Sequence, residues 1–133
     1  MKTRLFFVAL AMCLAFVSCK KDEKDARDNY VGTYRVDEKM TVDGGIYLDN
    51  YNISITKSSA NGTDIVINGL LGVPSISAVA SVNGDSFTIP QQTFSDVGLS
   101  GSGRRNGNSL TIYILATITG SGQANFELSA MKL

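Results

Sequence analysis

The feature that most constrains this chain is an alternation of apolar and polar residues from Tyr30 to the C-terminus. Apolar residues recur at every second position in short runs, and turn dipeptides such as Asn61-Gly62 separate neighbouring runs. A period of two is typical of strands with one buried face, and Asn-Gly favours tight turns between strands. No stretch of helical length shows a 3.6-residue period. The sequence therefore predicts an all-β fold.

About eight strands are expected, and they lie around residues 30–42, 47–57, 65–67, 76–82, 87–89, 97–103, 110–115 and 124–130. Glu38 is the one polar residue on the apolar side of the first run, and Asp49-Asn50 suggests a bulge or loop in the second. Pro90 lacks an amide donor, so it should lie at a strand end, an edge or a bulge. Sequential hairpins favour a small up-and-down antiparallel β-barrel, because closure removes exposed edges; a β-sandwich is the alternative.

The first 18 residues have the composition of an export signal. Lys2 and Arg4 precede an apolar run that continues to Val17. The run is too short to span a bilayer as a helix. Positive charge, an apolar segment and a small residue before the cleavage point are typical of a signal peptide that is removed.

The end of this segment, Phe16-Val17-Ser18-Cys19, resembles the lipobox of bacterial lipoproteins. The resemblance implies that residues 1–18 are cleaved and that Cys19 carries fatty acyl chains such as palmitate. More than one acyl chain makes a stable membrane anchor. An ordinary secretory signal that happens to end in Cys is the alternative.

Residues 19–29 are expected to form the lipidated cysteine and a flexible charged tether. Eight of the ten residues from Lys20 to Asn29 are charged, and such a segment cannot bury enough apolar surface to fold. Lys21-Asp22-Glu23 is similar to a signal that directs lipoproteins of some Gram-negative anaerobes to the outside of the outer membrane. This resemblance implies display on the cell surface; the periplasmic face is the alternative.

Residues 30–133 resemble the calycin-like, or lipocalin-like, β-barrel lipoproteins of the same bacteria. The resemblance is carried by Tyr30-Val31-Gly32-Thr33-Tyr34, Phe87-Thr88-Ile89-Pro90-Gln91-Gln92 and Gly101-Ser102-Gly103. It implies an eight-stranded barrel, whose interior side chains just fill or which holds one small ligand. True lipocalins have Trp where this chain has Tyr34, with a late Arg packed over it, and no Arg follows Arg105. Because the strands are short, we expect a mostly filled core.

Composition argues against catalysis and against nucleic acid. The chain has no His, and its cysteines are Cys13, in the leader, and Cys19. Nucleophilic sites of the Ser-His-Asp and Cys-His types and His-rich zinc sites are therefore excluded. Loss of Lys2 and Arg4 with the leader leaves 10 basic against 12 acidic residues, a net charge of −2. We expect no enzyme, no cofactor and no nucleic-acid partner.

Three further groups of residues have the side chains of a possible site. Asp43, Asp49 and Asn50 offer oxygen ligands, but they lack a calcium-loop pattern and Asp is common in turns, so no metal is expected. Glu38 and Glu127 are the only glutamates of the body, and nothing pairs them for glycoside hydrolysis. The segment 101–107 superficially resembles a phosphate cradle, but its spacing fits no known fingerprint, and a hairpin loop is expected there.

Tyrosines are the best binding candidates, because tyrosine combines apolar area with a hydroxyl group. The candidates are Tyr34, Tyr47, Tyr51 and Tyr113. Outward rings on a β-surface can stack on sugars, whereas packing within the sheet is the alternative.

The sequence as a whole predicts a membrane-anchored lipoprotein that acts as a non-catalytic binding or accessory module for a small ligand, a glycan or a protein. The alternative is a structural or inhibitory lipoprotein with a filled barrel that acts only through its outer surface. An open cavity would favour the first, and a packed interior would favour recognition by the outer face.

Overall fold

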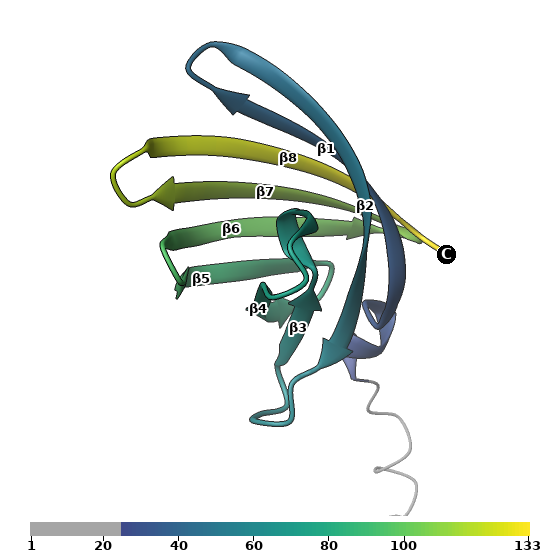
Figure 1. Cartoon of the computed structure of the whole chain (residues 1–133). Coiled ribbons are helices and arrows are strands. Elements are labelled where there is room, and N and C mark those ends of the chain that lie inside the picture. The colour runs from purple at the N-terminus through teal and green to yellow at the C-terminus, as the bar shows by residue number, and fades with distance from the viewer. Residues whose placement is uncertain (1–24) are drawn as a thin grey trace, which may run out of the picture.

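The computed structural model describes residues 25–133, which form a closed barrel of eight antiparallel strands (Figure 1). Each strand pairs with its neighbours in chain order, and β8 pairs with β1 to close the ring. The strands are β1 (Gly32–Val42), β2 (Gly45–Lys57), β3 (Asp64–Asn68), β4 (Ser77–Asn83), β5 (Ser86–Phe94), β6 (Val97–Asn106), β7 (Ser109–Ile118) and β8 (Gly122–Lys132). The prediction of an all-β, up-and-down barrel of about eight strands is confirmed, and the alternative sandwich does not form.

Two short 3₁₀ helices complete the described structure, η1 (Ala26–Asn29) and η2 (Leu70–Gly72). Within residues 25–133, neither helix nor any other segment offers a helical stretch long and apolar enough to cross a bilayer.

The alternation of apolar and polar residues in the sequence separates the inward face of the barrel from its outward face. Inward positions such as Val36, Ile53, Ile112 and Leu128 are buried, and their neighbours in the chain face outward. The inward side chains form one apolar cluster that occupies the interior. The complete ring and its core lie within residues 25–133, so this part of the chain contains a whole folding unit.

Close packing accounts for two of the glycines in strand β6. A Cβ on Gly103 would lie 2.0 Å from Cζ of Phe87, and one on Gly101 would lie 2.2 Å from the carbonyl oxygen of Tyr113. Only glycine fits at such approaches. The predicted hairpin loop at 101–107 is wrong for most of its length, because β6 continues to Asn106 and only Gly107 and Asn108 form the turn.

The two predicted irregularities have different outcomes. Strand β2 pairs with β1 in one unbroken register through Asp49 and Asn50, so the bulge or loop expected there is wrong. The register of β5 against β6 shifts between Ile89 and Gln92, which places Pro90 at a bulge, as predicted.

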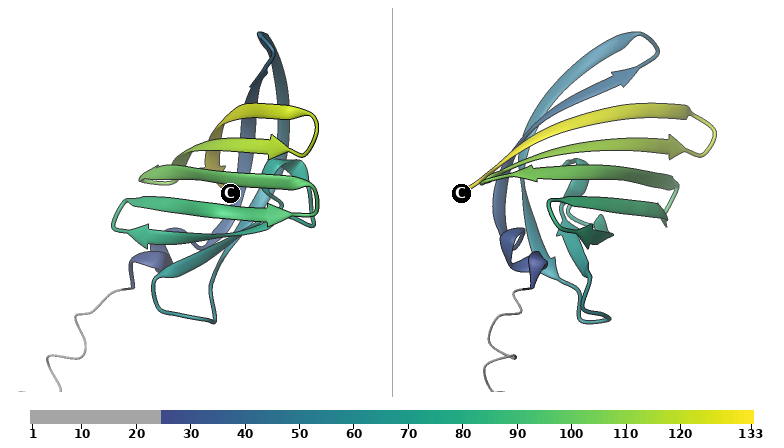
Figure 2. Two further views of the ribbon diagram at one scale, coloured as in Figure 1. Left: turned by 90° about the vertical axis from the view of Figure 1, so that its left-hand side faces the viewer. Right: turned by 180° about the vertical axis from the view of Figure 1, so that it is seen from behind.

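The barrel has two distinct ends (Figure 2). The turns that join β1 to β2, β5 to β6 and β7 to β8 lie at one end, together with η2, and we call it the hairpin end. Helix η1 and the loop between β2 and β3 lie at the other, which we call the N-terminal end. The β1–β2 hairpin projects beyond the rest of the hairpin end.

The predicted tether is corrected in its last part. The segment from Asp25 to Asn29 is not a flexible linker: Asp25 caps η1, and η1 is joined to the barrel by side-chain contacts. Cys19, residues 1–18 and residues 20–24 lie outside the described residues.

Candidate functional site

The four candidate tyrosines do not come together, and two of them belong to the interior. Tyr34 is buried, and its hydroxyl donates to the carbonyl oxygen of Tyr30 at 2.8 Å. The Nζ atom of Lys132 lies 5.6 Å from the centre of the Tyr34 ring. A cation from the last strand therefore lies over the ring of Tyr34.

Tyr51 is half-buried and faces the interior, where its hydroxyl donates to Oε1 of Glu38 at 2.8 Å. Glu38 is the only buried charged side chain among residues 25–133. Burial raises the pKa of its carboxyl group, while the hydrogen bond from Tyr51 acts in the opposite direction. Burial and the neighbouring Glu38 also raise the pKa of the Tyr51 hydroxyl.

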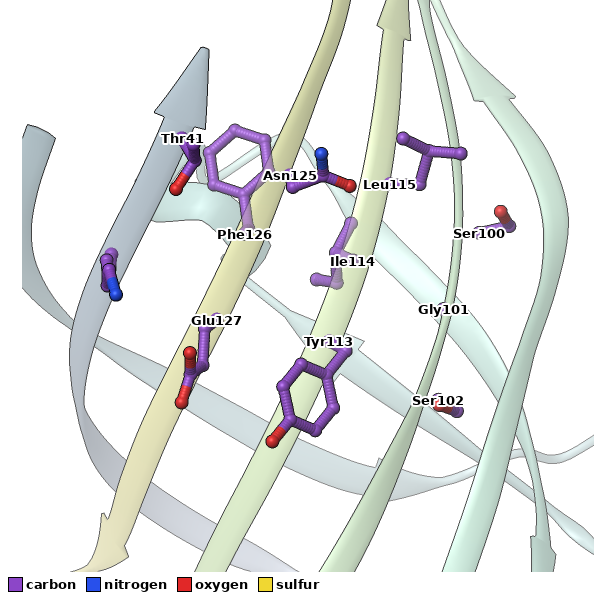
Figure 3. Close-up of a pocket in the computed structure, with 11 residues that line it drawn as sticks. Thr41, Ser100, Gly101, Ser102, Tyr113, Ile114, Leu115, Asn125, Phe126 and Glu127 are labelled. Carbon is purple, nitrogen blue, oxygen red and sulfur yellow. The ribbon is translucent and has the colours of Figure 1, made fainter. Parts of the chain in front are cut away.

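The other two tyrosines are exposed, but they lie on different parts of the molecule. Tyr47 is 57% exposed near the tip of the β1–β2 hairpin, where its ring lies over Gly45. Tyr113 is 55% exposed on the outer face of β7, between the buried residues Ile112 and Ile114. Tyr113 stands over a depression of the barrel wall (Figure 3).

The outer surface around Tyr113 is built from cross-strand rows. Ser102 of β6, Glu127 of β8 and Lys39 of β1 lie in the same row as Tyr113. The next row toward the hairpin end contains Ser100, Leu115, Asn125 and Thr41. Since the serines of β6 are small and Tyr113 and Leu115 are large, the surface drops from β7 to β6, and this step forms one wall of a depression of about 370 Å³.

A second depression lies on the other side of the same ring. It has a volume of about 500 Å³ and shares Ser102 and Tyr113 with the first. Its remaining lining comes from β5, β6 and β7, with Ser86, Phe87, Thr88, Gly103, Arg104 and Thr111. Tyr113 is therefore a ridge between two adjacent hollows. We call these two hollows and Tyr113 the Tyr113 surface.

The lining of the Tyr113 surface is rich in hydroxyl groups. Ser86, Thr88, Ser100, Ser102 and Thr111 can each donate and accept hydrogen bonds. Glu127 and Lys39 at one side and Arg104 at the other add separate charges. Aromatic area flanked by a few polar groups is the usual composition of a site that orients a ligand.

The calcium candidates do not assemble. Asp43 lies in the β1–β2 turn with φ of 47°, and Asp49 and Asn50 lie within β2. The Asp49 carboxylate accepts the backbone N–H of Asn50 at 2.8 Å. In the described part of the chain, no three His, Cys, Asp or Glu side chains are grouped as metal ligands would be.

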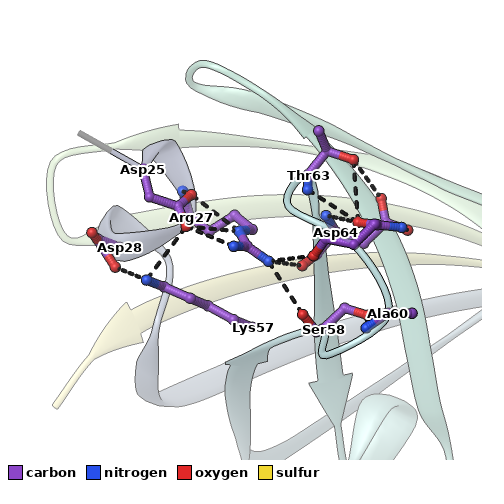
Figure 4. Close-up of polar contacts among 9 residues, drawn as sticks. Asp25, Arg27, Asp28, Lys57, Ser58, Ala60, Thr63 and Asp64 are labelled. Atoms are coloured by element: carbon purple, nitrogen blue, oxygen red, sulfur yellow. Dashed lines mark hydrogen bonds and ion pairs between the residues drawn. The ribbon is translucent and has the colours of Figure 1, made fainter. Parts of the chain in front are cut away.

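A polar cluster at the N-terminal end was not anticipated from the sequence (Figure 4). The Arg27 guanidinium pairs with Asp25 at 2.7 Å and holds the pKa of that carboxyl group well below its usual value. Lys57 pairs with both Asp25 and Asp28, and these contacts raise the pKa of its ammonium group. Arg27 also donates to three carbonyl oxygens around the β2–β3 loop, those of Ser58, Asn61 and Asp64. The cluster joins η1 to the loop, so its polar groups already have partners.

Comparison with known proteins assigns the chain to no group: no protein-family model matches it, and no curated protein has a matching sequence.

Proposed function

We propose that this protein is a lipid-anchored, non-catalytic binding module that recognises an uncharged, hydroxyl-rich ligand, such as a glycan, through the Tyr113 surface. The observation that carries the proposal is the position of Tyr113, an exposed ring shared by two adjacent hollows. A ring in this position can stack on the apolar face of a sugar, while neighbouring hydroxyls bind the sugar's own hydroxyl groups. Two hollows in succession suit a chain of several sugar units.

The packed interior supports recognition from outside. The inward side chains form one continuous cluster, and the hydroxyls of Tyr34 and Tyr51 are bonded within the protein. A ligand in the core would have to displace these contacts. The outer wall needs no such rearrangement, so we assign binding to it.

The proposed anchor is Cys19, placed in the outer membrane with the barrel on the cell surface. This rests on the lipobox-like Phe16–Cys19 and on Lys21-Asp22-Glu23. The described chain starts at Asp25 at the N-terminal end, so an anchor that precedes it leaves the wall around Tyr113 accessible. Incorporation of labelled fatty acid at Cys19 and protease shaving of intact cells test these two points.

The ligand is tested by native gel electrophoresis in gels that contain neutral polysaccharides, with an acidic polysaccharide for comparison. We expect a neutral polysaccharide to retard the wild-type barrel. Tyr113→Ala should weaken this binding by at least about tenfold, because exposed aromatic anchors contribute on the order of 2 kcal/mol or more to binding.

The matched control is Tyr47→Ala, which removes an equally exposed ring from the hairpin and should leave the retardation unchanged. If no neutral polysaccharide binds, or if Tyr113→Ala binds as well as the wild type, the Tyr113 surface is not a glycan site. The alternative of a structural or inhibitory lipoprotein would then be favoured.

A further inference from the structure

The first half of β2 is an open strand edge. Strand β2 pairs with β1 from Gly45 to Ile55, but with β3 only from Ser54 to Lys57. Within the described chain, no strand pairs with residues 45–53 on the side that faces away from β1. Helix η2 approaches the later part, where Gly72 lies against the Tyr51 ring. The freely accessible part is residues 45–50, which we call the β2 edge.

The hydrogen-bonding groups of this edge can be assigned from its neighbours. The N–H of Ser58 donates to Asp64, so even-numbered residues of β2 direct their backbone groups toward β3. Because these directions alternate along a strand, Ile46, Leu48 and Asn50 direct their N–H and C=O groups to the open side. Asn50 agrees with this assignment, since its N–H is bonded to the Asp49 carboxylate and not to β1.

The β2 edge lacks most of the features that usually block pairing, and Asp49 is its one charged residue. Exposed edges in natural proteins usually carry Lys, Pro or a bulge, or are covered by another element. Residues 45–50 contain no Lys, Arg or Pro, and their pairing with β1 has no bulge. Ile46 and Leu48 are 60% and 80% exposed on the outer face, and Tyr47 is exposed on the other face. Apolar side chains on both faces would be buried if another strand were added.

We propose that a second copy of this chain pairs with the β2 edge, antiparallel, about a two-fold axis at Leu48. A two-fold interface uses the same patch on both copies, and two antiparallel edge strands meet this requirement. In this register Leu48 lies opposite the second copy's Leu48, and Ile46 lies opposite the second copy's Asn50. The two Leu48 residues can exchange two hydrogen bonds through their open-side backbone groups. Ile46 and Asn50 can do the same once the Asn50 N–H exchanges its bond to the Asp49 carboxylate for one to the second copy.

The side chains also select this register. Tyr47 comes to lie opposite the second copy's Asp49. Because the interface is symmetric, this pair of a hydroxyl and a carboxylate occurs twice. The same kind of bond already joins Tyr51 to Glu38 within the sheet. A two-fold axis at Asp49 would instead set two carboxylates opposite each other, which is destabilising. An axis at Tyr47 would place Asn50 opposite Gly44, which lies in the turn.

This inference does not depend on the proposed function. Strand β2 runs from the hairpin end to the N-terminal end, so the two barrels would meet at their hairpin ends and their Asp25 ends would point apart. One short strand pair buries a small area, so the association should depend on concentration.

The association is tested by sedimentation velocity over a concentration series, with a chain that begins at residue 20 and therefore has no cysteine. We expect a monomer–dimer equilibrium for the wild type and only monomer for Leu48→Lys, which places two cations at the axis. Met131→Lys alters an exposed apolar residue on the outer face of β8 and should dimerise as the wild type does. A wild type that stays monomeric at every concentration overturns the proposal, as does a dimer that persists in Leu48→Lys.

Disulfide formation tests the register. Residues opposite each other in a hydrogen-bonded pair have Cα atoms about 5.5 Å apart, which suits a disulfide. Leu48→Cys should therefore link to itself under mild oxidation. Ile46→Cys should not, because its counterpart lies four residues away, or about 14 Å, but it should link to Asn50→Cys when the two variants are mixed. Equal self-linking of Leu48→Cys and Ile46→Cys would show random collision and would overturn the pairing.

Discussion

At the scale of single residues, Glu38 is the clearest exception to the alternation of inward apolar and outward polar side chains in the barrel. It was visible in the sequence as the one polar residue on the apolar side of its strand, and the structure places it inside, 8% exposed, with Tyr51 as its donor. Parity also distinguishes the tyrosines. Tyr113 stands between Ile112 and Ile114 and must face outward, whereas Tyr34 shares its side with Val36 and must face inward. Which outward ring lies over a hollow depends on the neighbouring strands, and that information is not local.

The raised pKa of Glu38 predicts how stability depends on pH. The folded state holds the proton of Glu38 more tightly than the unfolded chain, where the carboxyl group has its ordinary pKa of 4.5. The stability that results is fully present below pH 4.5 and is lost as pH rises through the folded pKa. Glu38→Gln keeps an acceptor for Tyr51 but cannot ionise. Its melting temperature should exceed that of the wild type at pH 8, and the difference should shrink toward pH 4.

The control is Glu127→Gln, which changes the exposed glutamate of the body. It should show no comparable gain at pH 8. If the difference in melting temperature between Glu38→Gln and the wild type were constant from pH 4 to pH 8, ionisation of the buried carboxyl group would not destabilise the folded state.

At the scale of elements, the junction of β4 and β5 shows how a side chain can replace backbone hydrogen bonds between two strands. The ladder is interrupted at Pro90, which has no N–H to offer to β4. The Gln92 side chain provides the hydrogen-bonding partners that Val79 lacks on β5. Its Oε1 accepts from the N–H of Val79 at 2.9 Å, and its Nε2 donates to the Val79 carbonyl oxygen at 2.7 Å. The side-chain amide acts as a peptide group of the ladder, and the barrel closes across the bulge.

Gln92→Ala should therefore destabilise the barrel by about 1–3 kcal/mol, because it leaves a backbone donor and acceptor of β4 without partners. Urea unfolding measures the loss, and hydrogen exchange should show faster exchange at the Val79 amide. Gln91→Ala changes the exposed neighbour and should have little effect. Unchanged protection of Val79 in Gln92→Ala would show that the amide contributes nothing to closure.

The elements also show where prediction from sequence ends. Pro90 signals its own bulge, because the missing donor is a property of the residue. The role of Gln92 depends on its distance from Val79, which only the folded barrel defines. The bulge or loop expected at Asp49-Asn50 is absent for a related reason. Polar residues suggest a loop when a strand is assumed to be covered, but here β2 projects beyond the barrel and is exposed on both faces.

At the scale of the molecule, the contacts of η1 at the N-terminal end show where the folded unit begins. The sequence suggested a boundary at Tyr30, since the alternation starts there, and residues 25–29 resemble a linker by composition. Their attachment to the β2–β3 loop depends on Arg27 meeting carbonyl groups that are 31 to 37 residues away in the chain. Composition contains no such information, so the sequence predicts the start of the folded unit a few residues too late.

Tyr30 links this end to the core. It is fully buried, its ring meets Phe87 edge-on with 5.6 Å between centroids, and its hydroxyl donates to the Gly84 carbonyl oxygen at 2.9 Å. Tyr30→Ala should cost about 3–5 kcal/mol, as for other buried aromatics, whereas Tyr30→Phe keeps the ring and should cost only about 1 kcal/mol. Urea unfolding of a chain that begins at residue 20 gives both values. If Tyr30→Ala were as stable as Tyr30→Phe, the ring would not be part of the core, and the folded unit would begin at β1.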